Sequence, residues 1–423
     1  MLNNKFQIEK RKDCIKIILH RAIDGQFAGW LLLPVFSQLR REDFIRLAIS
    51  KYFQIGQIVD TLFAINGLSI KKGYGYEFEK DSNMLPIKPQ NTIERLKASI
   101  RNVELKDEIE QILVLIKDIL SLIADNYPEL SNECKCLLEQ NTQKLTNNSS
   151  RNVNNLRCIA DKIIRGLHED NKSWSIIIYG SFAMGQPDSD SDADMQVYCD
   201  SIPPKDMRME TIKSIIPEVK DFKQSDDEDT FWIEGHYLHI NFVESRKIDE
   251  ILARFPNFYW SDDDQLEAVQ SGIICFDSND RVLQWKDRLE NVSHDTTINR
   301  INVYLSDTKW WSFSLKKGID SKDLISIYFY LVEGMYALCN VIFALNGVFL
   351  VFPKWMKQTE SRMKIKPKDF YSRLVHIVNT EFSFSTYQEK IKEFFQLWDD
   401  TLSLIQKEYP NIDLSEVRNL LQR

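Results

Sequence analysis

The residues best suited to chemistry lie in the stretch 176–197, which reads IIIYGSFAMGQPDSDSDADMQV. We interpret it as an apolar strand, a turn at Gly180 and Ser181, a short connection, and a second strand that carries Asp192 and Asp194. Because residues two apart on a strand point to the same face, the two carboxylates converge. Two carboxylates beside a turn rich in exposed N–H groups can hold a divalent metal ion and the phosphates that it carries. The pattern therefore predicts phosphoryl or nucleotidyl transfer.

The elements that must position these residues form a mixed segment between two helical ones. Residues 14–125 have helical periodicity with few strand signals, and residues 295–420 return to the same pattern. Residues 126–155 turn polar and rich in Asn, which is typical of a connection. Within the mixed segment, which runs from 156 to 290, we expect helices at 156–168 and 204–219 and strands at 175–179, 193–199, 230–234 and 237–243.

The two helical segments resemble each other in sequence. The residues FAING at 63–67 match FALNG at 343–347, an offset of 280 (343 − 63), and at this offset Trp30 meets Trp310 and Asp43 meets Asp323. Further along, Ile-Lys-Pro recurs at 87 and 365 and Arg-Leu at 95 and 373, both at an offset of 278, which a small loop deletion explains. The alternative is a coincidence between two helical segments rich in Leu and Phe. We interpret the matches, which stay in order, as one helical module used twice.

Composition limits the classes of protein that fit. The chain has 423 residues and a net charge of −8, so the protein as a whole carries no excess of positive charge that would attract nucleic acid. Seven scattered cysteines argue against a disulfide framework, and the six histidines show no zinc spacing. The apolar run 325–350 is broken by Glu333, Asn340 and Asn346, which favours a buried helix over a membrane span. We expect a cytoplasmic protein that does not enter a membrane.

The stretch 176–197 resembles the signature of the DNA-polymerase-β-like nucleotidyltransferases, in which a Gly-Ser turn and a short connection precede Asp-x-Asp and an apolar strand. The resemblance is closest to the small-molecule branch with helical C-terminal domains, which includes aminoglycoside and lincosamide nucleotidyltransferases. It is strong across this stretch, weaker to residue 290, and only architectural beyond.

The resemblance assigns roles to residues of this stretch. Gly180 and Ser181 would hold the triphosphate of a nucleotide, and Asp192 and Asp194 would act as catalytic metal ligands for Mg²⁺ or Mn²⁺. The physical chemistry agrees, since glycine lets a backbone approach an oxyanion closely and Mg²⁺ prefers a few carboxylates together with phosphate oxygens. Gly185 and Ser191, which lie between the turn and the second strand, complete the nucleotide-binding residues that we expect.

A third carboxylate, which the family pattern places on a later strand, is missing. In the expected strand 237–244 the matching position is His239, and Asn241 follows on the same face. An imidazole can bind a metal ion or donate a hydrogen bond, but it does not replace an anion. We predict His239 as a metal ligand, and Glu234 or Glu244 as carboxylates that could serve instead as third ligand or base.

Two residues of the second helical segment complete the candidate site. Glu333 interrupts an apolar helix where the first copy has Phe53, and a carboxylate from the helical domain can accept the proton of an attacking hydroxyl. Lys354 stands beside Trp355 in a Phe-Pro-Lys-Trp sequence that the first copy lacks, and the pair could contact a phosphate and stack on a base. The alternatives are a glutamate at a solvent-facing helix edge, and a packed Trp355 with a solvated lysine.

These observations predict an α+β protein with a central mixed-sheet nucleotidyltransferase domain flanked by two related all-α domains. The expected reaction moves a nucleoside monophosphate from a nucleoside triphosphate to the hydroxyl of a small molecule and releases pyrophosphate, with a nucleic acid as an unlikely partner. Transfer to protein or tRNA and a catalytically silent nucleotide-binding module are the alternatives. The predicted parts are a helical domain at 1–125 that is a degenerate copy of the C-terminal module, a linker at 126–155, the nucleotidyltransferase domain at 156–290, and a helical substrate-side domain at 295–423.

Overall fold

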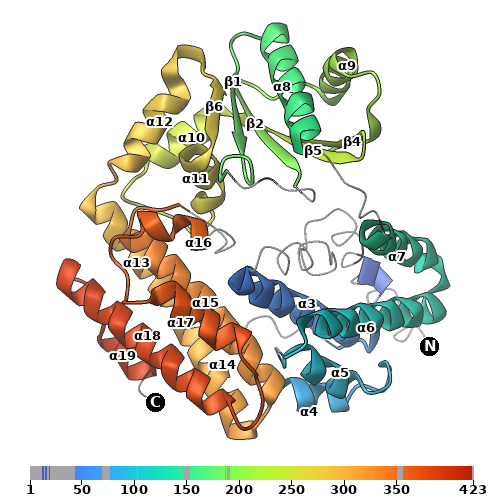
Figure 1. Cartoon of the computed structure of the whole chain (residues 1–423), viewed down its shortest axis with the longest axis vertical. Helices are drawn as coiled ribbons and strands as arrows, with labels where there is room; N and C mark the ends of the chain where they lie inside the picture. The colour runs from blue at the N-terminus through green and yellow to red at the C-terminus, as the bar shows by residue number, and fades with distance from the viewer. Residues whose placement is uncertain are drawn as a thin grey trace, which may run out of the picture.

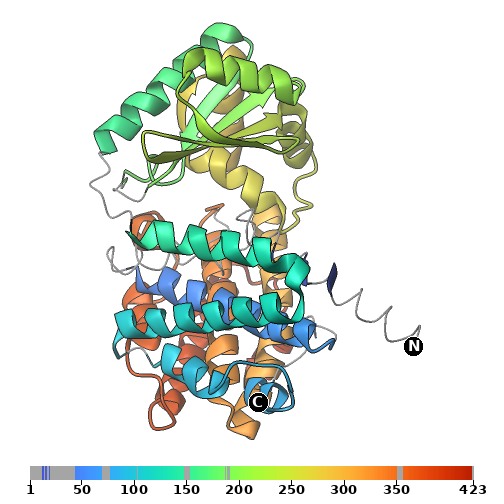
Figure 2. The same cartoon turned by 90° about the vertical axis from the view of Figure 1, so that its right-hand side faces the viewer.

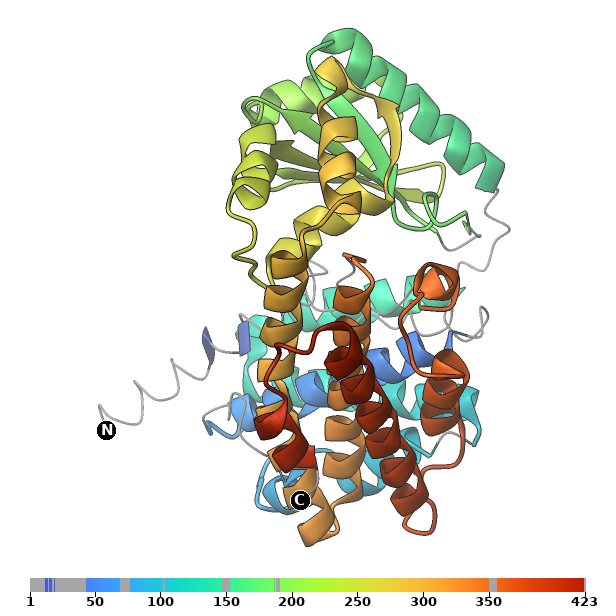
Figure 3. The same ribbon diagram turned by 90° about the vertical axis from the view of Figure 1, so that its left-hand side faces the viewer.

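A sheet domain lies above a larger helical body in the computed structural model (Figure 1). Figures 2 and 3 show from two further sides that helices from both ends of the chain lie together beneath the sheet domain. The structure describes residues 12, 13, 15, 16, 19, 43–68, 77–101, 103–146, 153–185, 187, 191–349 and 356–421.

Within the described residues, the sheet domain has six strands in the order β3-β4-β5-β2-β1-β6, and β2 and β5 are the one pair that runs in parallel. The mixed sheet that the sequence predicts is therefore confirmed, and its first two strands have the expected bounds. The outer strands β3 and β6 were not expected, because the first is polar and exposed and the second has only four residues. The strands are β1 (Ser175–Tyr179), β2 (Ala193–Cys199), β3 (Lys220–Gln224), β4 (Glu228–Ile233), β5 (His236–Glu244) and β6 (Ile273–Phe276).

Helices cover both faces of the sheet, which explains why β1 is almost continuously apolar. Ile176 and Ile178 point into a core formed with α8 (Val153–Asp170) and α9 (Lys205–Ile215), whereas Ile177 between them points into the core on the other face. The other face is packed by α10 (Ser245–Ala253), α11 (Asp262–Ser271) and α12 (Arg281–Glu290). With both faces buried, β1 and β2 form the centre of the sheet, and Gly180 follows β1 directly.

The helical body contains the helices that precede and follow the sheet domain. Their apolar side chains form one hydrophobic core, which includes residues of both segments. The N-terminal segment contributes α3 (Phe44–Ile65), α4 (Phe78–Asn83), α5 (Thr92–Ser99), α6 (Leu105–Asn126) and α7 (Ser131–Thr146). The C-terminal segment contributes α13 (His294–Ser306), α14 (Thr308–Ser321), α15 (Leu324–Leu345), α16 (Met356–Thr359), α17 (Phe370–Asn379), α18 (Tyr387–Glu408) and α19 (Ser415–Leu421).

The two segments are also joined by hydrogen bonds to the start of α15. The backbone N–H of Phe78 donates to Ser326 Oγ at 3.1 Å, and the backbone N–H of Glu79 donates to Asp323 Oδ2 at 2.8 Å. Two separate helical domains flanking the sheet domain are therefore not confirmed, because the segments build a single body. Within the described residues, α15 is the one helix long and apolar enough to cross a membrane, and 83% of its most apolar window is buried in this body.

The same hydrogen bonds recur in the two helical segments. Asn66 follows α3, and its side chain donates to the carbonyls of Leu62 and Ile87 and accepts from the Ile87 N–H, at 2.7–2.8 Å. Asn346 follows α15 and makes the same three bonds at 2.8 Å, to residues at the offsets found in the sequence. The same hydrogen-bonded geometry after both helices explains why both segments have Asn-Gly at this position.

Further recurrences extend along both segments. Arg95 binds Asp118 at 2.7 Å, and Arg373 at the equivalent place binds Asp400 at 2.6 Å. The helices that carry the two aspartates, α6 and α18, are each 22 residues long. Trp30, whose counterpart Trp310 lies on α14, falls outside the described residues.

Candidate active site

The turn after β1 is held by glycines in the left-handed region. Gly180 has a φ of +67° and Gly185 a φ of +70°, where residues with a Cβ are disfavoured. The Met184 N–H donates to the Gly180 carbonyl and the Gly185 N–H to the Phe182 carbonyl, both at 3.1 Å. The segment between the glycines is thus a compact turn at the end of the strand.

Gly180 lies directly against the carboxylate of Asp194. The antiparallel register pairs Tyr179 with Asp194, which brings the start of the turn beside this side chain. A Cβ built at Gly180 would collide with Asp194 Oδ2. Gly180 thus provides both a left-handed φ and the space that the Asp194 carboxylate occupies.

Two serines at the turn have buried hydroxyl groups. Ser181 is 6% exposed, and its Oγ has no hydrogen-bond partner among the described residues. Ser191, two residues before β2, is 5% exposed. A buried hydroxyl without a protein partner is normally satisfied by water or by a ligand. Ser181 therefore suits a phosphate oxygen at this turn.

Both expected carboxylates lie beside the turn. Asp194 is on β2 and Asp192 immediately precedes this strand. Burial raises the pKa of Tyr179 well above its usual range, and the charges of Asp194 and Asp192 raise it further. The pKa of Tyr237 on β5 is likewise raised by burial, with contributions from Glu228, Asp192 and Asp194. The two aspartates thus act on the same pair of phenol groups and create one region of negative charge.

His239 is the neighbour of Asp194 across the sheet. The parallel pairing of β2 and β5 aligns the two residues, and Nδ1 of His239 lies 3.4 Å from Asp194 Oδ1. Its Nε2 lies 3.1 Å from Glu228 Oε1. Burial by itself lowers the pKa of His239, but hydrogen bonding and charge from both carboxylates outweigh burial and raise this pKa to about 10. A metal ion bound to Nδ1 has to displace the proton.

The carboxylate beside His239 is Glu228, which we did not expect, rather than Glu234 or Glu244. Glu234 lies in the β4–β5 turn and accepts a hydrogen bond from Asn155 at 2.7 Å, and Glu244 pairs with Arg246 at 2.8 Å. The pairing register of β4 with β5 places Glu228 there. In a tight hairpin around the turn, Thr230 pairs with His239, and Glu228 lies on the same face two residues earlier.

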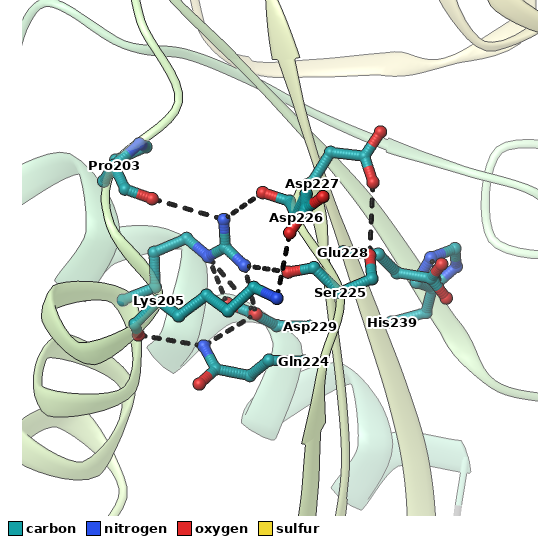
Figure 4. A network of polar contacts seen from close by, with 10 residues as sticks. Pro203, Lys205, Gln224, Ser225, Asp226, Asp227, Glu228, Asp229 and His239 are labelled. Atoms are coloured by element: carbon teal, nitrogen blue, oxygen red, sulfur yellow. Dashed lines mark hydrogen bonds and ion pairs between the residues drawn. The ribbon is translucent and has the colours of Figure 1, made fainter.

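A buried arginine holds the turn before Glu228, and Figure 4 shows Ser225 and Asp226 of this turn together with Glu228 and His239. Arg208 on α9 donates to the carbonyls of Ser225 and Asp226, each at 2.7 Å, and pairs with Asp229 at 3.0 Å. The side chains of Arg208 and Asp229 are at most 1% exposed, so the pair is shielded from solvent. Glu228 is the first residue of β4, and Arg208 binds the turn that precedes this strand to α9.

Glu333 and Lys354 are the expected site residues outside the sheet domain. Glu333 is on α15, and its pKa is raised to about 7 by burial and by the charge of Asp307. It lies twelve residues before Leu345 at the end of the helix, or about 18 Å along the axis. The end of α15 adjoins the sheet domain, where the Gln270 side chain binds the Gly347 carbonyl at 2.8 Å. Lys354 falls outside the described residues.

The residues at the turn fit the ion and phosphates that the sequence predicts. No three His, Cys, Asp or Glu side chains of the described residues already form a metal-binding group. Mg²⁺ is, however, commonly held by one or two carboxylates and completed by substrate phosphates, and Asp192 and Asp194 provide this pair beside the unpartnered hydroxyl of Ser181.

Two hollows on the described surface lie away from these carboxylates. The first, of about 640 Å³, lies between α8 and α9, and the second, of about 540 Å³, is bordered by α5, α6 and residues 381–384. Neither is lined by Asp192, Asp194 or His239.

Comparisons with known proteins give three findings. Residues 260–356 match a family described as a domain of unknown function (DUF4037), which covers the end of the sheet domain and the start of the C-terminal helical segment. The chain is similar to the solved structure of a nucleotidyltransferase-like protein from Exiguobacterium sibiricum 255-15, with 12% identity, a TM-score of 0.34, and coverage of 58% of this chain and 76% of that chain. No curated protein matches the sequence.

Proposed function

We propose that the protein is a metal-dependent nucleotidyltransferase that moves a nucleoside monophosphate from a nucleoside triphosphate to a hydroxyl of a small molecule. The observation that carries this proposal is the close packing of the Asp194 carboxylate on Gly180, beside the buried and unpartnered hydroxyl of Ser181. A carboxylate pair for a metal ion and a turn for phosphates are thereby adjacent, as nucleotidyl transfer requires.

Each residue has a role in this proposal. Asp192 and Asp194 hold Mg²⁺ or Mn²⁺, which when bound neutralises charge on the phosphates. Ser181 and the backbone that follows Gly180 hold oxygens of the triphosphate. The acceptor oxygen attacks the α-phosphorus, the bond to the bridging oxygen breaks, and pyrophosphate leaves. Gly185 and Ser191 shape the segment between the turn and β2.

The proton of the acceptor hydroxyl needs a base. We keep Glu333 as the candidate, because a carboxyl group with a pKa of about 7 is suited to proton transfer near neutral pH. Its position within α15 requires that the acceptor reach into the helical body. Lys354 remains a predicted contact to the nucleotide.

The net charge of −8 favours a small acceptor over a polynucleotide. A silent nucleotide-binding module is the second candidate, because His239 occupies the place of the third carboxylate and bridges Asp194 and Glu228. In that case nucleotide binding, measured by isothermal titration, is independent of metal ions and unchanged in Asp192→Ala.

Label transfer tests the main proposal. We expect the protein, incubated with α-labelled nucleoside triphosphates, Mg²⁺ or Mn²⁺ and a panel of hydroxylated acceptors, to release pyrophosphate and label one acceptor. Asp192→Asn and Asp194→Asn should abolish both signals. The matched control is Asp200→Asn, which removes an exposed carboxylate just beyond the other end of β2 that pairs with Arg281. Absence of transfer and of pyrophosphate with all nucleotides would sink the proposal.

A further inference from the structure

Two aromatic side chains lie next to each other on the outer part of the sheet. Trp232 on β4 pairs with Tyr237 on β5, and their ring centroids are 5.3 Å apart at an interplanar angle of 55°. Phe231 and Leu238, their neighbours in the sequence, point into the core formed with α8 and α9, so the aromatic pair points to the opposite face. Both residues of the pair are half-buried. A ring-shaped ligand can therefore lie against this pair.

The strand register places this aromatic pair next to the two aspartates. Ala193 pairs with Leu238, and Asp192 and Tyr237 each precede one of these two residues, so they lie side by side on adjacent strands. Asp192 and Asp194 are two residues apart and share a face. Burial raises the pKa of Tyr237, and carboxylate charges that include those of Asp192 and Asp194 raise it further. The phenol group thus lies within range of both aspartates.

The turn at Gly180 and the aromatic pair lie on opposite sides of the aspartates. The sheet order β4-β5-β2-β1 puts the turn that follows β1 on one side of β2 and the pair on the other. Adjacent strands are about 4.8 Å apart, so Tyr237 lies about 5 Å and Trp232 about 10 Å from Asp192 across the sheet. A small molecule that contacts the pair can therefore also reach the aspartates.

The surroundings of the pair suit the polar edge of a ring. Thr230 and His239 come next along the same face of β4 and β5, followed by Glu228 and Asn241. Their hydroxyl, imidazole, carboxylate and amide groups can donate to or accept from ring substituents. Sites for small molecules commonly combine aromatic faces with a few such polar groups, which determine the orientation of the ligand.

The geometry of nucleotidyl transfer requires the acceptor on the side of this pair. The acceptor oxygen loses its proton and bonds to the α-phosphorus as the bond to the bridging oxygen breaks, and the attacking and leaving oxygens are roughly in line. With the triphosphate held at Gly180 and Ser181, pyrophosphate leaves towards the turn, so the acceptor approaches from β5 and β4. We propose that Trp232 and Tyr237 bind the acceptor by stacking against a ring, of a sugar or a phenol, that carries the attacking hydroxyl. This inference rests on the proposed function, because it uses the same turn and aspartates.

Ligand binding by the full chain tests the inference without an activity measurement. Saturation-transfer NMR is recorded on the protein with Mg²⁺, a non-hydrolysable nucleoside triphosphate and one of three probes: methyl α-glucopyranoside, 4-hydroxybenzyl alcohol, or glycerol, which has hydroxyl groups but no ring. The variants are Trp232→Ala, Tyr237→Leu, and Trp232→Phe, which keeps an aromatic face. Trp260→Ala is the matched control, since this tryptophan is 68% exposed and lies just before α11. Isothermal titration gives the nucleotide affinity of each variant, and circular dichroism checks that each variant folds.

We expect the wild-type protein to bind at least one of the two ring probes and not glycerol. The affinity for that probe should fall about tenfold in Trp232→Ala and Tyr237→Leu, recover in part in Trp232→Phe, and stay unchanged in Trp260→Ala, while nucleotide affinity stays unchanged in all four. The inference is overturned if neither ring probe binds, if glycerol binds equally well, or if Trp232→Ala leaves probe affinity unchanged. Weaker nucleotide binding in Trp232→Ala also overturns it, because the pair then stacks on the nucleobase. If the wild-type protein binds no nucleotide with Mg²⁺, the proposed function itself fails.

Discussion

Replacing Gly180 with Ala tests the contact on which the candidate site depends. The substitution has two separate costs, because Gly180 has a φ of +67° and because the added Cβ would collide with Asp194 Oδ2. The backbone cost of a left-handed conformation is about 1–2 kcal/mol for a residue with a Cβ. The collision forces the Asp194 carboxylate away from the turn, or the turn away from β2.

Gly185→Ala separates the two costs. Gly185 has a φ of +70°, nearly the same as that of Gly180, but a Cβ there meets no atom within 4 Å. Both variants should therefore lose about 1–2 kcal/mol of unfolding free energy for the backbone alone. Only Gly180→Ala should also displace the carboxylate.

Two measurements decide the outcome. Urea unfolding gives the stability of both variants, and isothermal titration gives their affinity for a nucleoside triphosphate with Mn²⁺. We expect Gly180→Ala to lose at least about tenfold in affinity, which corresponds to about 1.4 kcal/mol, and Gly185→Ala to lose clearly less, because its Cβ displaces no carboxylate. If the two variants bind nucleotide equally well, the contact between Gly180 and Asp194 has no part in binding and our reasoning is refuted.

Three further predictions concern the helical body. The folded state raises the pKa of Glu333 from 4.5 to about 7, so the protonated carboxyl stabilises the fold below about pH 4.5 and this contribution is lost as the pH rises through 7. Glu333→Gln should therefore increase the free energy of unfolding by about 1–2 kcal/mol at about pH 9 and leave it unchanged at about pH 4, as measured by chemical unfolding. Asn66→Ala and Asn346→Ala should each cost about 2–3 kcal/mol, since each removes three hydrogen bonds, and clearly unequal losses would contradict the equivalence of the two corners. Lys51→Met should cost about 3–5 kcal/mol by leaving Glu108 buried and unpaired, and the double variant with Glu108→Gln should recover part of this loss; no recovery would argue against the ion pair.

Local sequence was sufficient to predict the centre of the sheet. The run of three isoleucines before Gly180 and the apolar residues after Asp194 predict β1 and β2 at their observed bounds, because a strand buried on both faces needs an apolar residue at nearly every position. The left-handed φ of Gly180 likewise agrees with a turn at this position. The repeated Asn-Gly corner was also visible, because one side chain makes the same three bonds at each copy.

Other features depended on residues distant in the chain. The edge strands β3 and β6 lack a clear apolar pattern and are stabilised by hydrogen bonds to their neighbours. The two helical segments appeared to be separate domains in the sequence, whereas their apolar faces bury each other in one core. The sequence of an amphipathic helix shows which of its faces is apolar, but it does not show which other helix that face will contact.

The sequence by itself determined the chemical types at the site, namely a glycine and a serine at a turn, two aspartates in alternation and a histidine on a later strand. These follow from local spacing, since the period of a strand decides which side chains share a face. Only the tertiary structure decided that Glu228, and neither Glu234 nor Glu244, stands beside His239. The reason is the pairing register of β4 with β5 and of β5 with β2, which depends on hydrogen bonds between strands and is absent from any single segment of the chain.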